Sequence, residues 1–373
     1  TWNIHLQLNG PPTLPHTNFT QKKFWLKKKH VFAEVLVKID CVGICGSDVK
    51  IYSSGKCGLE ELTEPLVMGH EGAGVIVEVG RNVRDLKVGD RVAIEPTQPC
   101  RACIYCKQGK YNLCELPRYC SASGTHGNLC RYYKHIADFC HKMPDNLSME
   151  EGAAVQPLAI ALHACNRAGI KLGQSLLVLG AGPIGVLCAM TARAMGVSKI
   201  LITDVVQSRL DTAKRLGVQY TLQIKKEDTD QQTVDAIVKL LGGQPDVTID
   251  ACAFPSAQRV SMMVTKTAGV VLVVGIGDPV VHVPLTGALL REVDVRGSYR
   301  INNTYPPALA AVASGAINLK SFITHRFPLE KTQEAIELAK SGAAMKIIIK
   351  VHNYSAFYSP LLMLSLLYHF IFY

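Results

Sequence analysis

Three residues with zinc-binding side chains lie in two glycine-rich stretches near the start of the chain. Cys45 stands in CVGICGSDVK, and His70 and Glu71 stand in PLVMGHEGAGVIVEVG. Thiolate, imidazole and carboxylate groups all bind zinc, and the adjacent glycines let the backbone bend so that distant side chains converge on one ion. Each residue alone is explained as well by burial or a hydrogen bond. Together they predict a catalytic metal site.

A second set of metal-binding side chains follows within fifteen residues, in PCRACIYCKQGKYNLC. Its members are Cys100, Cys103, Cys106 and Cys114. Four thiolates can close a tetrahedron around one zinc ion and leave no position for a substrate, which is typical of a structural site. An iron–sulfur cluster has the same ligands and stays open as an alternative, although no other feature indicates electron transfer.

A nucleotide-binding pattern occupies residues 176–204, LLVLGAGPIGVLCAMTARAMGVSKILITD. Gly180 allows a tight turn, Gly182 lets a pyrophosphate approach the N-terminus of a helix, and Gly185 allows close packing of helix and strand. Asp204 ends the next apolar run, where a carboxylate accepts hydrogen bonds from the ribose hydroxyls. A 2′-phosphate would meet its negative charge, so the pattern favours NAD over NADP.

The residues of the nucleotide-binding pattern must be held by regular elements. Residues 158–299 alternate between apolar, strand-like segments and segments with a helical pattern. Such alternation predicts an α/β domain with a doubly wound parallel sheet. Residues 31–157 carry the metal-binding motifs between strand-like segments. The helix, strand, helix, strand pattern of 300–351 is expected to return and complete that first domain. A helix is also expected after a cap at Asp145 or Ser148, and it carries Gln156 toward the cleft between the domains.

Composition limits the class of protein. The 373 residues are 48% hydrophobic and 19% charged, as in ordinary globular proteins. Half of the net charge of +10 comes from lysines within residues 22–29, so no basic binding face and no nucleic-acid partner are expected. The 13 cysteines, in a long chain without a recognisable signal peptide, indicate a reducing compartment, and we expect the cytoplasm.

Both ends of the chain differ in pattern from the rest. Residues 1–30 are an atypical segment with proline pairs and no sustained period. Residues 352–373 form an apolar tail of unassigned role, whose length is borderline for a membrane-spanning helix. We expect membrane association only if that tail serves as an anchor.

Taken together, the motifs resemble the zinc-dependent medium-chain dehydrogenases, and within them the sorbitol (L-iditol 2-) dehydrogenases. The resemblance covers about residues 31–351 and depends on GICGSD, GHEGAG, GDRVAIEP, the four-cysteine segment, GNLCRYYKH, HKMPDN, GAGPIG, REVDVRGSYR and THRFPLEK. It implies a mainly β, GroES-like catalytic domain beside a Rossmann domain. It also implies oxidation of a polyol to the ketose with NAD, and a homo-oligomer, tetramer or dimer.

The resemblance implies roles for individual residues. Cys45, His70 and Glu71 would bind the catalytic zinc, Ser47 would start a proton relay, and Arg300 would reach the polyol. The positions matching NAD contacts are Gly180, Gly182, Pro183, Ile184, Gly185, Asp204, Arg209, Val274, Gly275, Ile276, Ser298, Tyr299 and Arg300.

Two positions depart from the family pattern. Gln156 stands where a glutamate usually holds the water on the zinc, and Ile51, next to Tyr52, stands where a tyrosine usually contacts the substrate. An amide removes one negative charge near the zinc, which predicts a lower pKa for the water or alcohol bound there. Two alternatives stay open: a related zinc dehydrogenase for xylitol, a butanediol or threonine, and a catalytically silent scaffold.

Overall fold

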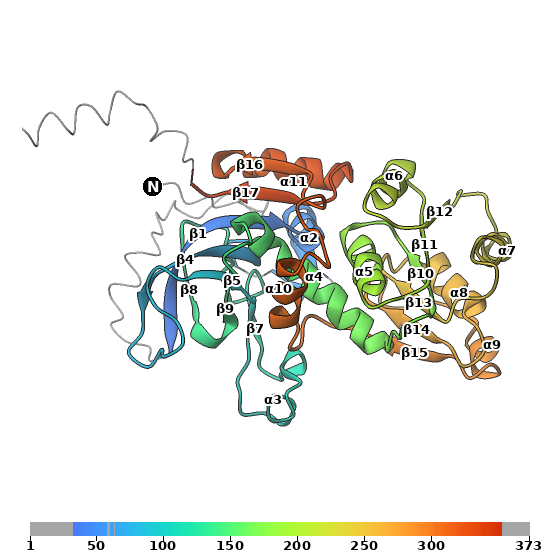
Figure 1. Ribbon diagram of the computed structural model, residues 1–373, viewed down its shortest axis with the longest axis horizontal. Coiled ribbons are helices and arrows are strands. Elements are labelled where there is room, and N and C mark those ends of the chain that lie inside the picture. The colour runs from blue at the N-terminus through green and yellow to red at the C-terminus, as the bar shows by residue number, and fades with distance from the viewer. Residues whose placement is uncertain (1–32, 58–59, 63, 353–373) are drawn as a thin grey trace, which may run out of the picture.

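The computed structural model describes residues 33–57, 60–62 and 64–352, so the predictions for 1–30 and 353–373 lie outside the described residues. These residues form two lobes, and helix α4 (Met149–Ala168) runs from one lobe to the other (Figure 1). The first lobe carries the metal-binding motifs and the second carries the nucleotide-binding pattern.

The first lobe is built on a mainly antiparallel sheet with β1 at its centre. Its strands are β1 (Glu34–Ile44), β4 (Glu71–Val79), β5 (Arg91–Ile94), β8 (Tyr132–Ile136), β9 (Cys140–Lys142), β16 (His325–Pro328) and β17 (Ile347–Lys350). The order is β16-β17-β1-β4-β5-β9, and β8 pairs with β1 as well. One half of β1 pairs with β8 and the other half with β17, so strands from both ends of the described chain share this sheet.

Shorter elements surround this sheet. They are α2 (Gly46–Ser54), β2 (Lys56–Cys57), β3 (Glu60–Glu61), β6 (Thr97–Gln98), α3 (Ile104–Lys107), η1 (Tyr111–Leu113), β7 (Arg118–Tyr119), η2 (Ala137–Phe139), α10 (Tyr305–Ala313), η3 (Leu329–Lys331) and α11 (Thr332–Ser341). The segment around α3 projects from the lobe (Figure 1).

The second lobe is a parallel sheet in the order β12-β11-β10-β13-β14-β15. Its strands are β10 (Ser175–Leu179), β11 (Lys199–Asp204), β12 (Tyr220–Gln223), β13 (Val247–Asp250), β14 (Val270–Val273) and β15 (Asp294–Gly297). Its helices are α5 (Pro183–Ala194), α6 (Gln207–Arg215), α7 (Asp230–Leu241), α8 (Pro255–Val264) and α9 (Leu285–Leu289). This confirms the predicted fold class, a doubly wound α/β domain beside a mainly β domain.

The alternation of side chains along β10 explains why both faces of the parallel sheet are covered. Leu176 and Val178 belong to the apolar cluster that includes residues of α5 and α6. Leu177 and Leu179 belong to a different cluster, with residues of α7 and α8. Because successive side chains of a strand point to opposite faces, an uninterrupted apolar strand needs helices on both sides.

Helix α4 joins the two lobes. Its N-cap is Ser148, which forms a capping box with Glu151, so of the two expected caps the structure uses Ser148. Small side chains such as Ala153 and Ala161 let the helix pack closely, and its apolar cluster includes residues of both sheets. The helix continues without interruption through the expected domain boundary at 157/158, because one apolar core covers it on both sides of that point.

None of the helices within residues 33–57, 60–62 and 64–352 has the length and hydropathy needed to span a membrane.

Candidate active site

The three predicted ligands of a catalytic metal lie at the adjoining ends of two paired strands. Cys45 lies between β1 and α2, and His70 and Glu71 lie at the start of β4. The antiparallel register places Gly43 opposite Glu71, which brings the end of β1 beside the start of β4. One ligand atom from each of the three residues lies within 4.8 Å of the others. A thiol, an imidazole and a carboxylate this close fit a zinc ion and leave room for a fourth ligand.

Asp48 holds the first two of these ligands in place. Its carboxylate accepts hydrogen bonds from the backbone N–H of Cys45 at 2.9 Å and of Gly69 at 3.3 Å, and it lies 3.5 Å from Nδ1 of His70. Burial alone would lower the pKa of His70, but the charges of Asp48 and Cys45 raise it above the usual value. A carboxylate on one ring nitrogen leaves the other nitrogen for the metal, as in most zinc-binding histidines.

Glu71 is held by a buried lysine from the other end of the chain. Lys346 Nζ lies 2.7 Å and 2.6 Å from the two carboxylate oxygens of Glu71, and it also donates to the carbonyl of Ile44 at 3.0 Å. Glu71 is 0% exposed and Lys346 is 3% exposed. A Cβ atom on Gly43 would lie 2.0 Å from Glu71 Oε2, so a glycine at this position leaves the space that the carboxylate occupies.

Three polar side chains lie beside the metal-binding cluster. Gln156 Nε2 donates to the hydroxyl of Tyr119 at 3.2 Å, and the Tyr119 ring lies 6.0 Å from that of His70. The guanidinium of Arg300 lies over the Tyr119 ring at 4.4 Å and over the Tyr299 ring at 4.8 Å. Such cation–π contacts fix a guanidinium in place. These contacts place an amide, a phenol hydroxyl and a guanidinium next to the metal-binding cluster.

Two residues of α2, at and beside the position where the family usually has a substrate-contacting tyrosine, pack into the apolar core. Ile51 is buried in the apolar cluster of the first lobe, and Tyr52 packs against the same cluster. Ser47 lies in the first turn of α2, two residues after Cys45, and is half-buried.

The segment that carries Arg300 is attached to the cysteine lobe, which comprises residues 100–114. Asn112 Nδ2 donates to the carbonyl of Tyr299 at 2.9 Å. The backbone N–H of Asn303 donates to the hydroxyl of Tyr111 at 2.7 Å. Arg300 itself has a φ of 56°, a backbone conformation that is rare for residues other than glycine. The cysteine lobe therefore fixes the strained turn from which Arg300 extends.

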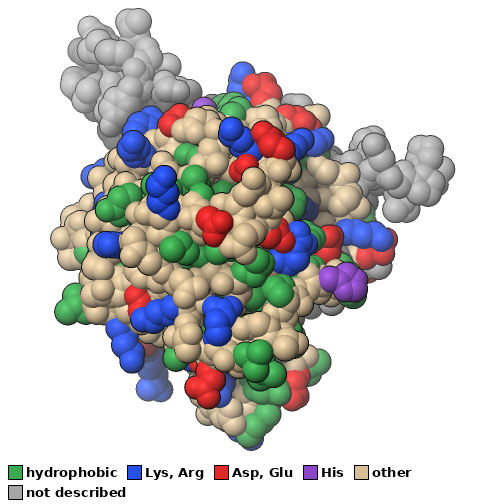
Figure 2. Space-filling model, turned by 90° about the vertical axis from the view of Figure 1, so that its right-hand side faces the viewer, with side chains coloured by type: hydrophobic (Ala, Val, Ile, Leu, Met, Phe, Trp, Pro, Cys, Tyr) green, Lys and Arg blue, Asp and Glu red, His purple; other side chains and the backbone are tan. Residues whose placement is uncertain are grey.

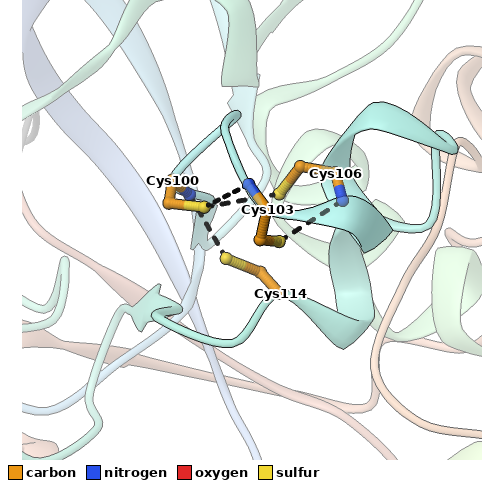
Figure 3. Close-up of side chains that lie close together, drawn as sticks. All are labelled: Cys100, Cys103, Cys106 and Cys114. Atoms are coloured by element: carbon orange, nitrogen blue, oxygen red, sulfur yellow. Dashed lines mark hydrogen bonds between the residues drawn. The ribbon is translucent and has the colours of Figure 1, made fainter.

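The four cysteines of this lobe converge, as Figure 3 shows. Their sulfur atoms all lie within 4.8 Å of one another, and those of Cys100 and Cys106 are 3.9 Å apart. A tetrahedral zinc with a Zn–S distance of about 2.3 Å requires sulfurs about 3.8 Å apart. Hydrogen bonds from the backbone N–H groups of Cys106 and Glu115 lower the pKa of Cys103 to about 6, whereas burial raises the pKa of Cys106 to about 12, so the convergence of the four sulfurs is the observation that indicates a metal. The lobe therefore fits a structural zinc.

The glycine-rich turn of the second lobe has the form that a dinucleotide needs. Gly180 has a φ of 99°, and a Cβ on Gly185 would lie 1.9 Å from the carbonyl oxygen of Gly180. Gly182 is the N-cap of α5, and a Cβ there would meet no atom within 4 Å, so the helix N-terminus is open. Pro183 and Ile184 form the first turn of α5. This arrangement fits a pyrophosphate.

Asp204 stands at the end of β11, next to the glycine-rich turn. Its carboxylate accepts hydrogen bonds from the backbone N–H of Ala181 at 2.8 Å and of Val206 at 2.9 Å. Arg209 Nη1 lies 3.9 Å from it. The acid is thus fixed at the carboxyl end of the sheet, where the ribose of a dinucleotide lies.

The other expected cofactor positions lie at the same edge of the sheet. Val274, Gly275 and Ile276 follow β14, and Ser298 follows β15. A Cβ on Gly275 would lie 2.9 Å from the backbone nitrogen of Ala253, so the glycine permits close packing there. The carbonyl of Ile276 accepts a hydrogen bond from Lys50 of α2 at 3.1 Å, which joins the two lobes across the site.

Sequence reasoning missed Asp48, Tyr119, Asn112 and Lys346. Asp48 is part of the GICGSD motif, and an acid three residues after a metal-binding cysteine could have been identified as a partner for a metal ligand. Tyr119 follows the cysteine lobe without any motif of its own. Lys346 lies 275 positions after Glu71, and only the pairing of β17 with β1 brings it close.

Comparison with known proteins gives consistent matches. Residues 32–145 match the alcohol dehydrogenase GroES-like domain, and residues 183–314 match the zinc-binding dehydrogenase family. The sorbitol dehydrogenase of Bombyx mori is 70% identical over 320 residues, which are 86% of this chain and 92% of the relative. That of Mus musculus is 44% identical over 348 residues, 93% and 96% of the two chains. The solved structure of 2R,3R-butanediol dehydrogenase from Bacillus subtilis is 28% identical, with a TM-score of 0.79, and covers 87% of this chain and 94% of its own.

Proposed function

The chain belongs to the zinc-binding, medium-chain dehydrogenases, in their sorbitol dehydrogenase branch, and we propose that it oxidises a secondary alcohol of a polyol to the ketose with NAD. The reverse reduction uses the same site. The observation that carries the proposal is the cluster of Cys45, His70 and Glu71 beside the polar side chains of Gln156 and Arg300. The names of the relatives in Bombyx mori and Mus musculus support the choice of a polyol.

Zinc and NAD would supply the reactive chemistry when bound. Cys45, His70 and Glu71 would hold a zinc ion that serves as a Lewis acid and lowers the pKa of an alcohol, and NAD would serve as the hydride acceptor. A second zinc held by Cys100, Cys103, Cys106 and Cys114 would stabilise the cysteine lobe.

The residues of the chain bind and orient the substrate. Arg300, held between Tyr119 and Tyr299, donates hydrogen bonds to hydroxyl groups of the polyol away from the reacting carbon. Ser47 begins the route by which the hydroxyl proton leaves, since it is close in sequence to Cys45 and half-buried. Orientation of this kind can contribute several kcal/mol to lowering the barrier.

The preference for NAD follows from Asp204. Its carboxylate would accept hydrogen bonds from the ribose hydroxyls and repel the 2′-phosphate of NADP. Arg209 lies 3.9 Å away and partly balances this charge, and it would contact the adenosine side of NAD. The strand-end positions Val274, Gly275, Ile276 and Ser298 would line the nicotinamide side.

We also propose that the chain forms a homo-oligomer through the second lobe. Strand β15 is at the edge of the parallel sheet, and exposed apolar side chains lie on it and near it. They are Val280, Leu285, Leu289, Leu290 and Val295, and Leu290 is 80% exposed. On the face shown in Figure 2, hydrophobic side chains lie among charged ones. Light scattering of the purified protein tests for a dimer or tetramer. The cytoplasmic location stays a prediction from the cysteine content.

A second candidate is oxidation of a different secondary alcohol, such as xylitol, a butanediol or threonine. Two observations favour it: Gln156 replaces the expected glutamate, and Ile51 packs into the core instead of reaching the site. The structural similarity to a butanediol dehydrogenase is compatible with both candidates.

The test is NADH formation by the zinc-loaded protein with sorbitol, xylitol, threonine, 2,3-butanediol and simple secondary alcohols, with NAD and NADP in parallel. We expect NAD-linked oxidation of sorbitol or xylitol that a chelator abolishes. Activity on a non-polyol alone would move the substrate assignment. No activity at a zinc content of two ions per chain would favour the silent scaffold.

A further inference from the structure

The amide of Gln156 is buried and only half satisfied. The side chain is 1% exposed, and its Nε2 donates to the Tyr119 hydroxyl at 3.2 Å. Its Oε1 is buried and has no hydrogen-bond partner within the residues that the structure describes. A buried carbonyl without a partner is unfavourable, because it has lost its hydrogen bonds to water and gained none in the protein. The unpaired oxygen therefore indicates that a hydrogen-bond donor from a bound molecule belongs there.

The environment determines which end of the amide should face that molecule. The guanidinium of Arg300 brings positive charge and lies 4.4 Å over the Tyr119 ring. A metal ion held by Cys45, His70 and Glu71 would add positive charge on the same side. A carbonyl dipole is favourable toward positive charge, and an NH₂ group is not. The two ends of an amide are nearly equal in size, so charge and hydrogen bonding, and not shape, distinguish them. The Tyr119 hydroxyl oxygen accepts a hydrogen bond from Nε2, and this contact holds the orientation that the positive charge favours.

We propose that Tyr119 is a positioning residue, which accepts a hydrogen bond from Gln156 Nε2 and so presents Oε1 to the hydroxyl group that is held at the metal. The proposal rests on the proposed function for the identity of that hydroxyl group. It also explains how an amide can replace the glutamate usual in this family. The two oxygens of a carboxylate are equivalent, so a glutamate at this position needs no partner to choose its orientation, whereas a glutamine does.

The equivalence of carboxylate oxygens gives a sharp test. Four proteins are compared: the parent chain, Tyr119→Phe, Gln156→Glu, and the double variant. The expected result is a loss of about tenfold in kcat/KM for the best polyol when Tyr119→Phe is made in the parent chain. The same change in the Gln156→Glu background should alter kcat/KM by less than about twofold. Circular dichroism of all four proteins shows that each is folded.

A second measurement does not depend on turnover. The four proteins are loaded with cobalt(II), and the visible spectra with and without Tyr119→Phe are compared in each background. Cobalt in the cysteine lobe contributes equally to both spectra of a pair, so its contribution cancels in their difference. Tyr119→Phe should change the spectrum in the parent background and leave it unchanged in the Gln156→Glu background. If no alcohol is oxidised by the parent chain, the proposed function fails, and the spectra still decide the role of Tyr119.

Two results would overturn the proposal. One is an equal effect of Tyr119→Phe in both backgrounds, because the hydroxyl would then act on the substrate directly rather than through the amide. The other is no effect in the parent background on either kcat/KM or the cobalt spectrum.

Discussion

Replacing Lys346 by methionine should destabilise the protein strongly when no zinc is present. Lys346→Met preserves most of the side-chain volume and removes the charge that contacts both oxygens of Glu71. Glu71 is 0% exposed, so its carboxylate would stay in the interior without a cation. Removing one partner of a buried ion pair costs about 3–5 kcal/mol in the free energy of unfolding.

Zinc should reduce this cost, because it offers Glu71 a second cation. The loss of unfolding free energy that Lys346→Met causes without zinc, minus the loss that it causes with zinc, must equal the gain in zinc-binding free energy of the variant. A gain of about 1.4 kcal/mol corresponds to a tenfold higher affinity for zinc. The assay is urea unfolding followed by circular dichroism, once with chelator and once with saturating zinc. The same variant should bind zinc more tightly at the catalytic site, which competition with a chromophoric chelator measures.

Lys350→Met is the matched control. Lys350 lies on the same strand, β17, and pairs with Glu150 at 2.9 Å, but its side chain is 36% exposed. Exposed ion pairs contribute about 0–1 kcal/mol, and zinc should not affect this one. Equal losses for the two variants, or a loss for Lys346→Met that zinc leaves unchanged, would refute the reasoning.

Three further predictions concern the reaction. Gln156→Glu restores a negative charge near the zinc, so the pH–rate profile should move to more alkaline pH, and an unmoved profile would contradict this. Asp204→Ser removes the charge that repels a 2′-phosphate, and the ratio of kcat/KM for NAD to that for NADP should fall by at least about tenfold. An unchanged ratio would exclude Asp204 as the discriminating group. Asn112→Ala removes the hydrogen bond to the Tyr299 carbonyl, worth about 1 kcal/mol, and should raise KM for the polyol about fivefold. KM for NAD and the zinc content should stay as they were, and a change in both would indicate a general loss of structure.

The sequence was sufficient for the features that short-range patterns encode. The alternation of apolar strands and helices determined the doubly wound sheet, because each β10 side chain must be covered on its own face. The cysteine spacing predicted that Cys100, Cys103, Cys106 and Cys114 converge, because a short segment can close on one point. The capping pattern left Asp145 and Ser148 as candidates, and the structure uses Ser148, which forms a capping box with Glu151.

Contacts between distant segments could not be predicted in the same way. Lys346 meets Glu71 only because β17 pairs with β1 on one side and β4 pairs with it on the other. The Tyr119 hydroxyl meets Gln156 because β7 and α4 lie together, and no pattern around Tyr119 indicates this. The burial of Ile51 was also hidden, because α2 is short and of mixed polarity, and the sequence alone leaves the direction of its side chains open.

The attachment of Arg300 shows how the two lobes share one site. The backbone N–H of Ser298 still donates to the carbonyl of Val273 in the parallel sheet, at 2.9 Å. The next carbonyl, that of Tyr299, is bound by Asn112 of the cysteine lobe. The chain thus passes from one lobe to the other between these two residues, and Arg300 lies on the side of the metal ligands. Arg300 is therefore held with the first lobe, because Asn112 and Tyr111 of the cysteine lobe form hydrogen bonds with the segment that carries it.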